Sequence, residues 1–319
     1  MDFEGVGGPN TLSGIKSSTV TPTFAYNTVN HPITPTRGLR VNFGFGFTGV
    51  VLGGNVNTLQ PNLDIAHFRK GLFKGNVQGF HLNAKFIAGF GGRVAPPYDR
   101  YYMGGESDIR GFDILTISPI AFIPTSTSVP VYNNDGTPRV QKVINSNGTV
   151  SYNAVNTTIP VYRLILPGGD TSVVANYEYR IPIFGPVTLA PFMDAGIDDL
   201  LLPSQLGLNQ GQVSNLNALF PQSDFGRRAY IAPHTQPVRI STGLELQVLM
   251  PVVNAPFRLY WAYNPSIVNT TLQAPIVAGS DYFPNNVTYQ NAITSGYLGA
   301  SQQYHERHSI FRFSIGRTF

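Results

Sequence analysis

The clearest signal in the chain is strict alternation of apolar and polar residues over short segments. Between Leu39 and Thr48, large apolar side chains occupy the odd positions, and Arg, Asn, Gly and Thr occupy the even ones. A period of two places these sets on opposite faces of a β-strand. Similar patterning recurs and predicts nine strands, near residues 16–29, 39–48, 62–72, 80–90, 173–183, 187–194, 238–248, 257–264 and 311–316.

The connections between these strands differ strongly in length. Gly185-Pro186 and residues 251–256 are short turns, whereas other connections run for tens of residues. Strands of about 9–11 residues joined alternately by short and long connections are typical of outer-membrane barrels. In the longest connection, residues 125–160 are rich in Asn, Thr and Ser, and we expect an exposed, mobile segment with room for a small hairpin. The long connections are 93–170, 198–236 and 265–308.

Composition changes the interpretation of the apolar faces. Only 12% of the 319 residues are charged, 12% are aromatic, and the chain holds 33 Gly and 25 Pro. A soluble β-sandwich would carry charges on the outer face of each sheet, but here the apolar face is nearly free of charge. No apolar run reaches about 18 residues, so no transmembrane helix is expected. The pattern favours an all-β, antiparallel transmembrane β-barrel over a soluble sandwich.

Several kinds of chemistry have little support. The absence of cysteine excludes disulfides, thiol catalysis and zinc-thiolate sites. The net charge of +4 is scattered, which gives nucleic-acid binding little support. His305-Glu306-Arg307-His308 could ligate a metal and Asp198-Asp199 could bind calcium, but exposed polar loops explain both better. No phosphate loop or Ser-His-Asp spacing stands out, so we expect neither an enzyme nor a cofactor.

The longest connection contains a compact glycine-rich motif. Residues 101–112 read YYMGGESDIRGF. Gly104, Gly105 and Gly111 permit backbone angles that other residues resist. Arg110 lies among apolar neighbours, and its fork-shaped guanidinium favours a carboxylate partner elsewhere in the fold. The alternative is an ordinary turn with a solvated arginine.

This motif resembles the conserved loop of the BamA-like outer-membrane assembly factors, the bacterial surface-antigen family. The shared pattern is Gly-Gly, a few residues, and then Ile-Arg-Gly-Phe. Three further stretches agree in order and spacing: Pro35 to Gly38 resembles a family turn, 192–196 an aromatic-x-Asp-x-Gly strand, and 311–319 the terminal strand. The motif residues here are Gly104, Gly105, Ile109, Arg110, Gly111 and Phe112.

The resemblance implies a partial barrel. The family's barrel has sixteen strands and follows periplasmic domains that bind polypeptide. Matched from the C-terminus, residues 1–319 correspond to strands eight to sixteen, with 93–170 as the external loop. The N-terminal sequence MDFEGVGGPN has no signal peptide. We therefore expect the C-terminal part of a longer barrel protein, without its early strands and periplasmic domains.

The resemblance also implies a lock between the loop and the barrel wall. In the family, the loop arginine folds into the lumen and pairs with acids there. Arg110 matches that arginine, Asp194 the strand aspartate and Glu178 a lumen glutamate. Alternation independently places Glu178 and Asp194 on the inward face of neighbouring strands. The alternative is that both acids merely line a polar lumen.

The terminal strand has a second implied role. Its ending resembles the signal by which barrel proteins are recognised for assembly. In the family, the first and last strands meet in a weak seam, which can open and pair with a client strand. Alternatively, the terminal aromatic residue only anchors the strand at the membrane interface. The residues concerned are Phe311, Phe313, Ile315, Gly316 and Phe319.

The function implied by the resemblance is assembly of other barrel proteins. Such a factor folds and inserts β-barrel proteins into the bacterial outer membrane through its seam. Its expected partners are outer-membrane lipids, unfolded outer-membrane protein clients and accessory lipoproteins, with no nucleic acid. Two alternatives remain: a polypeptide-exporting relative, of the two-partner secretion or translocation and assembly type, and a passive porin.

Overall fold

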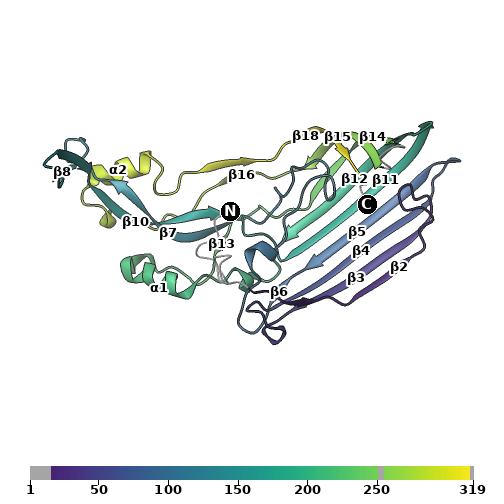
Figure 1. Ribbon diagram of the computed structural model, residues 1–319. Helices are drawn as coiled ribbons and strands as arrows, with labels where there is room; N and C mark the ends of the chain where they lie inside the picture. Colours follow the sequence, from purple (N-terminus) through teal and green to yellow (C-terminus); the bar gives the residue numbers. More distant parts are fainter. Residues whose placement is uncertain (1–15, 251–254, 317–319) are drawn as a thin grey trace.

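A computed structural model describes residues 16–250 and 255–316 of the chain. The described chain has two parts, a broad curved sheet and an elongated arm that extends from one end of it (Figure 1). The two α-helices lie in the arm (Figure 1). No helix in the described part has the length and apolarity needed to cross a membrane.

The sheet follows a path of nine strands, and each neighbouring pair is antiparallel. The two-residue strand β6 (Ala88–Gly89) pairs with β4 beside the end of β5. In sheet order the strands are β1 (Thr19–Val20) with β2 (Thr23–Asn27) on the same edge, β3 (Gly38–Thr48), β4 (Thr58–Lys70), β5 (Val77–Phe86), β11 (Thr171–Phe184), β12 (Val187–Asp199), β14 (Arg239–Met250), β15 (Ala255–Ser266) and β18 (Ser309–Ile315).

The nine predicted strands are all present with shifted ends, and the first is divided into β1 and β2. The largest shifts are in β12, which ends at Asp199 rather than 194, and in β4, which begins at Thr58 rather than near 62. In β4, Pro61 is an unusual residue within a strand, although it pairs with Phe45 in the regular register. The prediction of an antiparallel wall of about nine strands is therefore confirmed.

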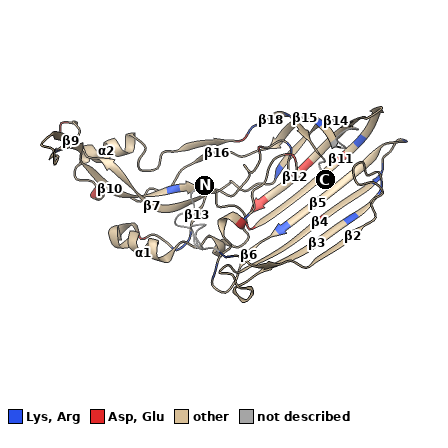
Figure 2. Ribbon diagram, viewed as in Figure 1, with Lys and Arg blue, Asp and Glu red and all other residues tan. Residues whose placement is uncertain are grey.

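The two faces of the wall differ as the alternation predicts. Phe313 is 72% exposed on the outer face, whereas its neighbour Ser314 is only 7% exposed. The sheet does not close among the described residues, because no strand there joins β1 and β2 to β18. This open, barrel-type sheet agrees with the predicted partial barrel. Charged residues are scattered singly along its strands (Figure 2).

Short and long connections lie at opposite ends of the wall. The short turns include 28–37, 71–76 and 185–186, and the long connections lead into the arm (Figure 1). The arm contains β7 (Ala121–Pro130), β8 (Val140–Ile144), β9 (Val150–Ala154), β10 (Asn156–Ile165), β13 (Tyr230–Ile231), β16 (Asn269–Leu272), β17 (Gln302–His305), α1 (Gln210–Leu219) and α2 (Asn286–Thr294). Short 3-10 turns are η1 (Val50–Leu52), η2 (Pro97–Asp99), η3 (Pro203–Leu206), η4 (Pro221–Ser223) and η5 (Ser280–Tyr282).

Residues 125–160 are more regular than the sequence predicts. Strands β7 and β10 pair continuously from Asn156↔Pro130 to Ile165↔Ala121, and β8 and β9 form the small hairpin beyond them. Val129 and Ile159 pack in a buried cluster with Ala292 of α2. The segment therefore forms regular strands, including the small hairpin, because residues distant in sequence supply its apolar partners; its mobility stays a prediction.

Candidate functional site

The glycine-rich motif folds back from the arm onto the inner face of the wall. Met103 pairs with Ile117 across a narrow turn, and Gly104 and Gly105 have φ angles of 114° and 97°. These positive angles favour glycine. Ile109 and Phe112 are buried against Val174 of β11, together with Met103 and Ile117. The apolar residues of the motif therefore fix the loop on the wall.

Arg110 is fully buried and binds carboxylates of three neighbouring strands. Its Nε and Nη2 donate to the two oxygens of Asp194 on β12, at 2.8 and 2.7 Å. Its Nη1 donates to Glu178 of β11 at 2.6 Å and to Glu245 of β14 at 3.1 Å. Its backbone N–H also donates to Asp194, and its guanidinium lies 3.7 Å from the ring centre of Phe192. The fork geometry makes the Asp194 pair both strong and directional.

The surrounding charges balance. Arg180 donates from Nε to Glu178 at 2.8 Å, and Arg258 donates from Nε and Nη2 to Glu245, each at 2.6 Å. With Arg110 and Asp194, these residues form a set of three guanidinium groups and three carboxylates. Buried charges are tolerated when they are paired and hydrogen-bonded. We call these six residues the lumen network: Arg110, Glu178, Arg180, Asp194, Glu245 and Arg258.

The network keeps Arg110 charged. Burial by itself lowers the pKa of Arg110, but the charges of Asp194, Glu178 and Glu245 outweigh it and raise the pKa. The guanidinium is therefore charged, as arginine side chains in proteins generally are. Burial also raises the pKa of Asp108, a carboxyl group in the same loop.

Hydrogen bonds extend the network across the wall. Asn176 of β11 donates to Asp194 at 2.9 Å and to the backbone carbonyl of Asp108 at 2.7 Å. Its side-chain oxygen lies 2.8 Å from Nδ1 of His81, whose Nε2 lies 2.7 Å from Asp64 of β4. The loop is thereby connected through side chains to strands on one side of β11.

On the other side, the loop contacts the last two strands. Asn264 of β15 donates to the carbonyl of Gly111 at 2.6 Å and to the carbonyl of Arg307 at 2.8 Å. Asp113 forms an ion pair with Arg312 of β18. The stretch from Arg110 to Asp113 thus touches the wall from β11 to the terminal strand, which is the edge of the described sheet.

We expect the Asp113–Arg312 ion pair to restrict local opening of β18 while contributing little to overall stability. Both side chains are partly exposed, so Asp113→Asn should cost less than about 1 kcal/mol of unfolding free energy. Amide hydrogen exchange of residues 309–315 should nevertheless become faster. Arg312→Gln should show the same pattern. Unchanged exchange in both variants would contradict this coupling.

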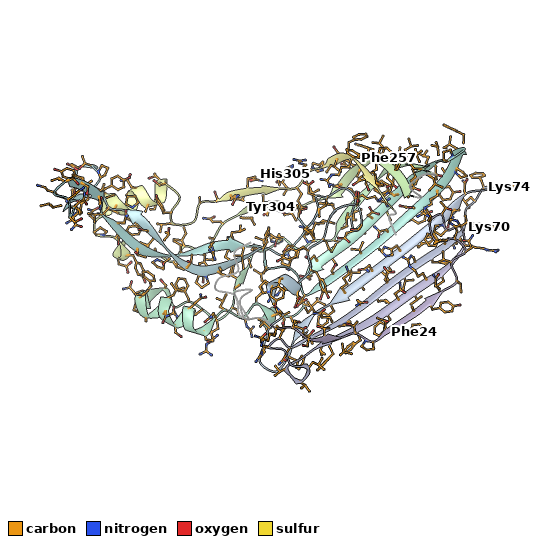
Figure 3. All side chains as sticks on the ribbon, in the orientation of Figure 1. Phe24, Lys70, Lys74, Phe257, Tyr304 and His305 are labelled. Carbon is orange, nitrogen blue, oxygen red and sulfur yellow. The ribbon has the colours of Figure 1, made fainter. Side chains whose placement is uncertain are left out.

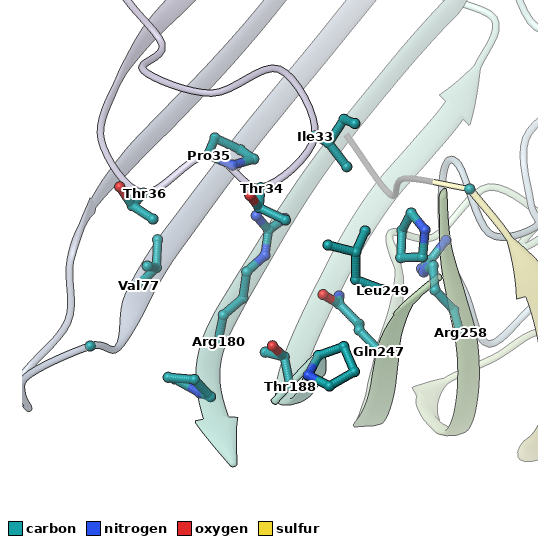
Figure 4. A pocket seen from close by; sticks show the side chains of 15 residues that line it. Ile33, Thr34, Pro35, Thr36, Val77, Arg180, Thr188, Gln247, Leu249 and Arg258 are labelled. Carbon is teal, nitrogen blue, oxygen red and sulfur yellow. The ribbon is translucent and has the colours of Figure 1, made fainter. Parts of the chain in front are cut away.

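The short-turn end of the lumen holds a small cavity. It measures about 180 Å³ and lies between the β2–β3 turn and the wall residues Arg180 and Arg258 (Figure 4). The turn contains the Pro35 to Gly38 stretch, where Asn30 accepts hydrogen bonds from the N–H groups of Thr36 and Arg37. This turn partly covers the lumen below the network.

The structure brings Arg110, Glu178 and Asp194 together as the sequence predicts, although their role as a lock stays a prediction. Glu245, Arg258 and Arg180 also belong to the network, and the family motif did not point to them. The available signal was alternation, because Glu245 faces inward on the strand next to Asp194. Asn264 and Asn176 gave no motif signal at all.

The terminal strand presents its predicted aromatic face. Phe311 is 65% exposed and Ile315 is 61% exposed, and Phe313 stacks on Phe257 with ring centres 6.3 Å apart. Gly316 has a φ of 135° and donates to the carbonyl of Pro256. Phe319 lies outside the described residues.

Among the weaker candidates, Glu306 and Asp199 have ordinary structural partners, whereas Asp198 is buried on β12 instead of being exposed in a loop as expected. Glu306 pairs with Arg239 at 3.0 Å and accepts from the N–H of Val268. Asp199 accepts a hydrogen bond from the N–H of Leu200. In the described ranges, no group of three His, Cys, Asp or Glu residues is arranged to hold a metal ion.

Comparison with known protein families identifies the superfamily. A family model described as the Omp85 superfamily domain matches residues 15–319. The chain belongs to the Omp85 superfamily. The resemblance seen in the four sequence stretches is therefore confirmed at the level of the Omp85 superfamily, and the match covers the loop motif, the wall and the terminal strand together.

One solved structure similar to this Omp85 chain is BamA from Haemophilus ducreyi lacking POTRA domains 1–3. The two share 18% sequence identity with a TM-score of 0.46. The match covers 93% of this chain and 42% of the other. This chain therefore corresponds to less than half of that protein.

Proposed function

We propose that this Omp85 chain is part of an outer-membrane protein assembly factor, which folds and inserts β-barrel proteins into the bacterial outer membrane. The observation that carries the proposal is the loop from Arg110 to Asp113, which joins the inner wall to the terminal strand β18. Superfamily membership supports a role in outer-membrane protein assembly or secretion. The clients, lipids and accessory lipoproteins are parts of the same proposal.

The backbone groups along the edge of β18 are those with which a client strand would pair. One side of β18 pairs with β15, and no strand in the described chain pairs with its other side. Unpaired backbone N–H and C=O groups in hydrocarbon cost several kcal/mol each. In the proposed longer barrel the first strand would meet this edge in a weak seam, and when the seam opens an incoming client strand would satisfy these groups by β-augmentation. The client's own strand pairing would then grow from this edge.

The lumen network acts as a positioning device in this proposal. No bond is made or broken there, and neither cofactor nor nucleotide is required. The network holds the loop on β11, β12 and β14, and the loop in turn contacts β15 and β18. Loop position and the freedom of the terminal edge are therefore linked. This feature favours a gated assembly factor over a passive porin, whose loop needs no contact with a mobile edge.

Reconstitution of the full-length protein tests the proposal. Liposomes with the protein should fold an unfolded barrel client faster than empty liposomes, as measured by the heat-sensitive shift of folded barrels in gel electrophoresis. Asp113→Asn should change that rate, whereas Asp281→Asn in the arm should not. Delivery of a soluble passenger into the liposome lumen, without faster client folding, would instead identify an exporter. A stable open conductance without either activity would identify a porin.

A further inference from the structure

The short-turn end of the wall carries a patch where exposed apolar and basic side chains lie together. The β4–β5 turn places Leu72 at 82% and Phe73 at 72% exposure, and Phe184 on the β11–β12 turn is 70% exposed. Lys70 and Lys74 lie at the same end of the sheet (Figure 3). We call this group the rim patch: Arg69, Lys70, Leu72, Phe73, Lys74 and Phe184.

The turn that carries the patch is hydrogen-bonded to the neighbouring strand. The N–H of Gly71 donates to the carbonyl of Asn76 at 2.7 Å, which closes the turn. The hydroxyl of Tyr179 on β11 then accepts from the N–H of Leu72 at 3.1 Å and from the side chain of Asn76 at 3.0 Å. Leu72 and Phe73 are therefore exposed on an anchored turn.

The basic residues of the rim patch have no acidic residues near them in the sequence. The sequence has no Asp or Glu between Asp64 and Asp99, nor between Glu178 and Asp194. Among the described residues, no carboxylate forms an ion pair with Arg69, Lys70 or Lys74. The three cations therefore create a positive rim beside the apolar side chains.

The guanidinium of Arg69 is oriented on the outer face. Its Nε donates to Gln78 at 2.7 Å, and its carbon lies 5.2 Å from the ring centre of Phe80. Phe80 is itself partly exposed and packs on Tyr177, with ring centres 4.9 Å apart. An aromatic band with an ordered cation at its border is the arrangement expected where a barrel wall meets lipid headgroups.

Two properties of a membrane surface match the patch. Its acyl boundary accepts apolar side chains, and its phosphates attract cations. A zwitterionic headgroup neutralises its phosphate with its own cation, whereas an anionic headgroup does not. Each Lys or Arg near an anionic surface strengthens binding several-fold. The uncompensated positive charge therefore favours anionic lipid.

We propose that the rim patch binds the headgroup of an anionic phospholipid. Leu72, Phe73 and Phe184 enter the acyl boundary, Arg69 and Lys74 contact the phosphate, and Lys70 adds positive charge from the inner side of the same rim. The site would hold lipid at the short-turn end of the wall. The inference depends on the wall spanning a membrane, and it is independent of which polypeptide the protein handles.

Lipid binding to the full-length protein in an uncharged detergent tests the proposal. The probe is phosphatidylglycerol labelled on an acyl chain, followed by fluorescence anisotropy and compared with labelled phosphatidylcholine. The wild type should bind phosphatidylglycerol more tightly, and the double variant Lys70→Gln/Lys74→Gln should bind it about tenfold more weakly. The matched control is Arg139→Gln/Lys142→Gln, which removes two exposed cations from the arm. A second variant, Leu72→Ser/Phe73→Ser, should weaken binding of both lipids.

Three results would overturn the proposal. These are equal affinity of the wild type for the two lipids, equal losses in the rim and control double variants, and complete competition by soluble glycerol phosphate. The last result would indicate a site for a free phosphate. The heat-sensitive shift of each variant in gel electrophoresis verifies that the wall is folded before binding is compared.

Discussion

Replacing Arg110 by alanine should destabilise the protein by about 3–5 kcal/mol, because it leaves buried carboxylates without their shared cation. Glu178 and Glu245 keep Arg180 and Arg258 as partners, so Asp194 takes most of the effect. We expect the loop to leave the wall. Thermal unfolding in detergent and protease cleavage within 101–112 measure the two consequences.

Matched variants separate the loss of the charge pair from the loss of any arginine. Arg139→Ala removes an exposed arginine of the arm and should leave the unfolding temperature within experimental error. Arg110→Lys should recover only part of the stability, because an ammonium group cannot reproduce the two-pronged contact with Asp194. Wild-type stability and protease resistance in Arg110→Ala would contradict the lock.

Replacing Gly111 by alanine should have the second large effect. A Cβ at this position would overlap the side-chain oxygens of Asn264 and Ser241, both of which are fully buried on wall strands. Overpacking of a buried site costs typically about 1–3 kcal/mol. We expect the upper part of that range, because displacing Gly111 also strains the hydrogen bond from Asn264 to its carbonyl. Thermal unfolding measures the effect.

The control for this substitution is Gly226→Ala. Gly226 lies in the arm, has no atoms near the position of an added Cβ and has no positive φ angle. This variant should be close to neutral, since alanine there meets neither crowding nor backbone strain. Equal unfolding temperatures for Gly111→Ala and the wild type would show that the loop does not pack against β14 and β15 as described.

The wall was predictable because its signal is local. Alternation along each strand reports directly which residues face the lumen, so Glu178 and Asp194 could be placed inside from sequence. The two acids lie on strands joined by a two-residue turn, which also fixes their proximity. The family motif then supplied Arg110 as their partner.

The rest of the site was harder to predict from the sequence, because its interacting residues are far apart along the chain. Glu245 joins Arg110 across 135 residues, and Asn264 joins Gly111 across 153. Alternation gives the face of a strand but not the loop that reaches it. The helices of the arm were also hard to predict. α2 has few apolar residues, and its N-cap, Asn285, looks like a polar loop residue in the sequence. Only the structure shows that the Asn285 side chain accepts a hydrogen bond from the N–H of Thr288.

The central interaction of the site joins a guanidinium carried by the long loop to a carboxylate on the inner wall. A double-mutant cycle with Arg110→Ala, Asp194→Ala and the combined variant measures their coupling in the unfolding free energy. We predict a coupling of at least about 2 kcal/mol, because close, buried charge pairs reach such values. Additive effects, with a coupling near zero, would show that Arg110 and Asp194 do not bind each other.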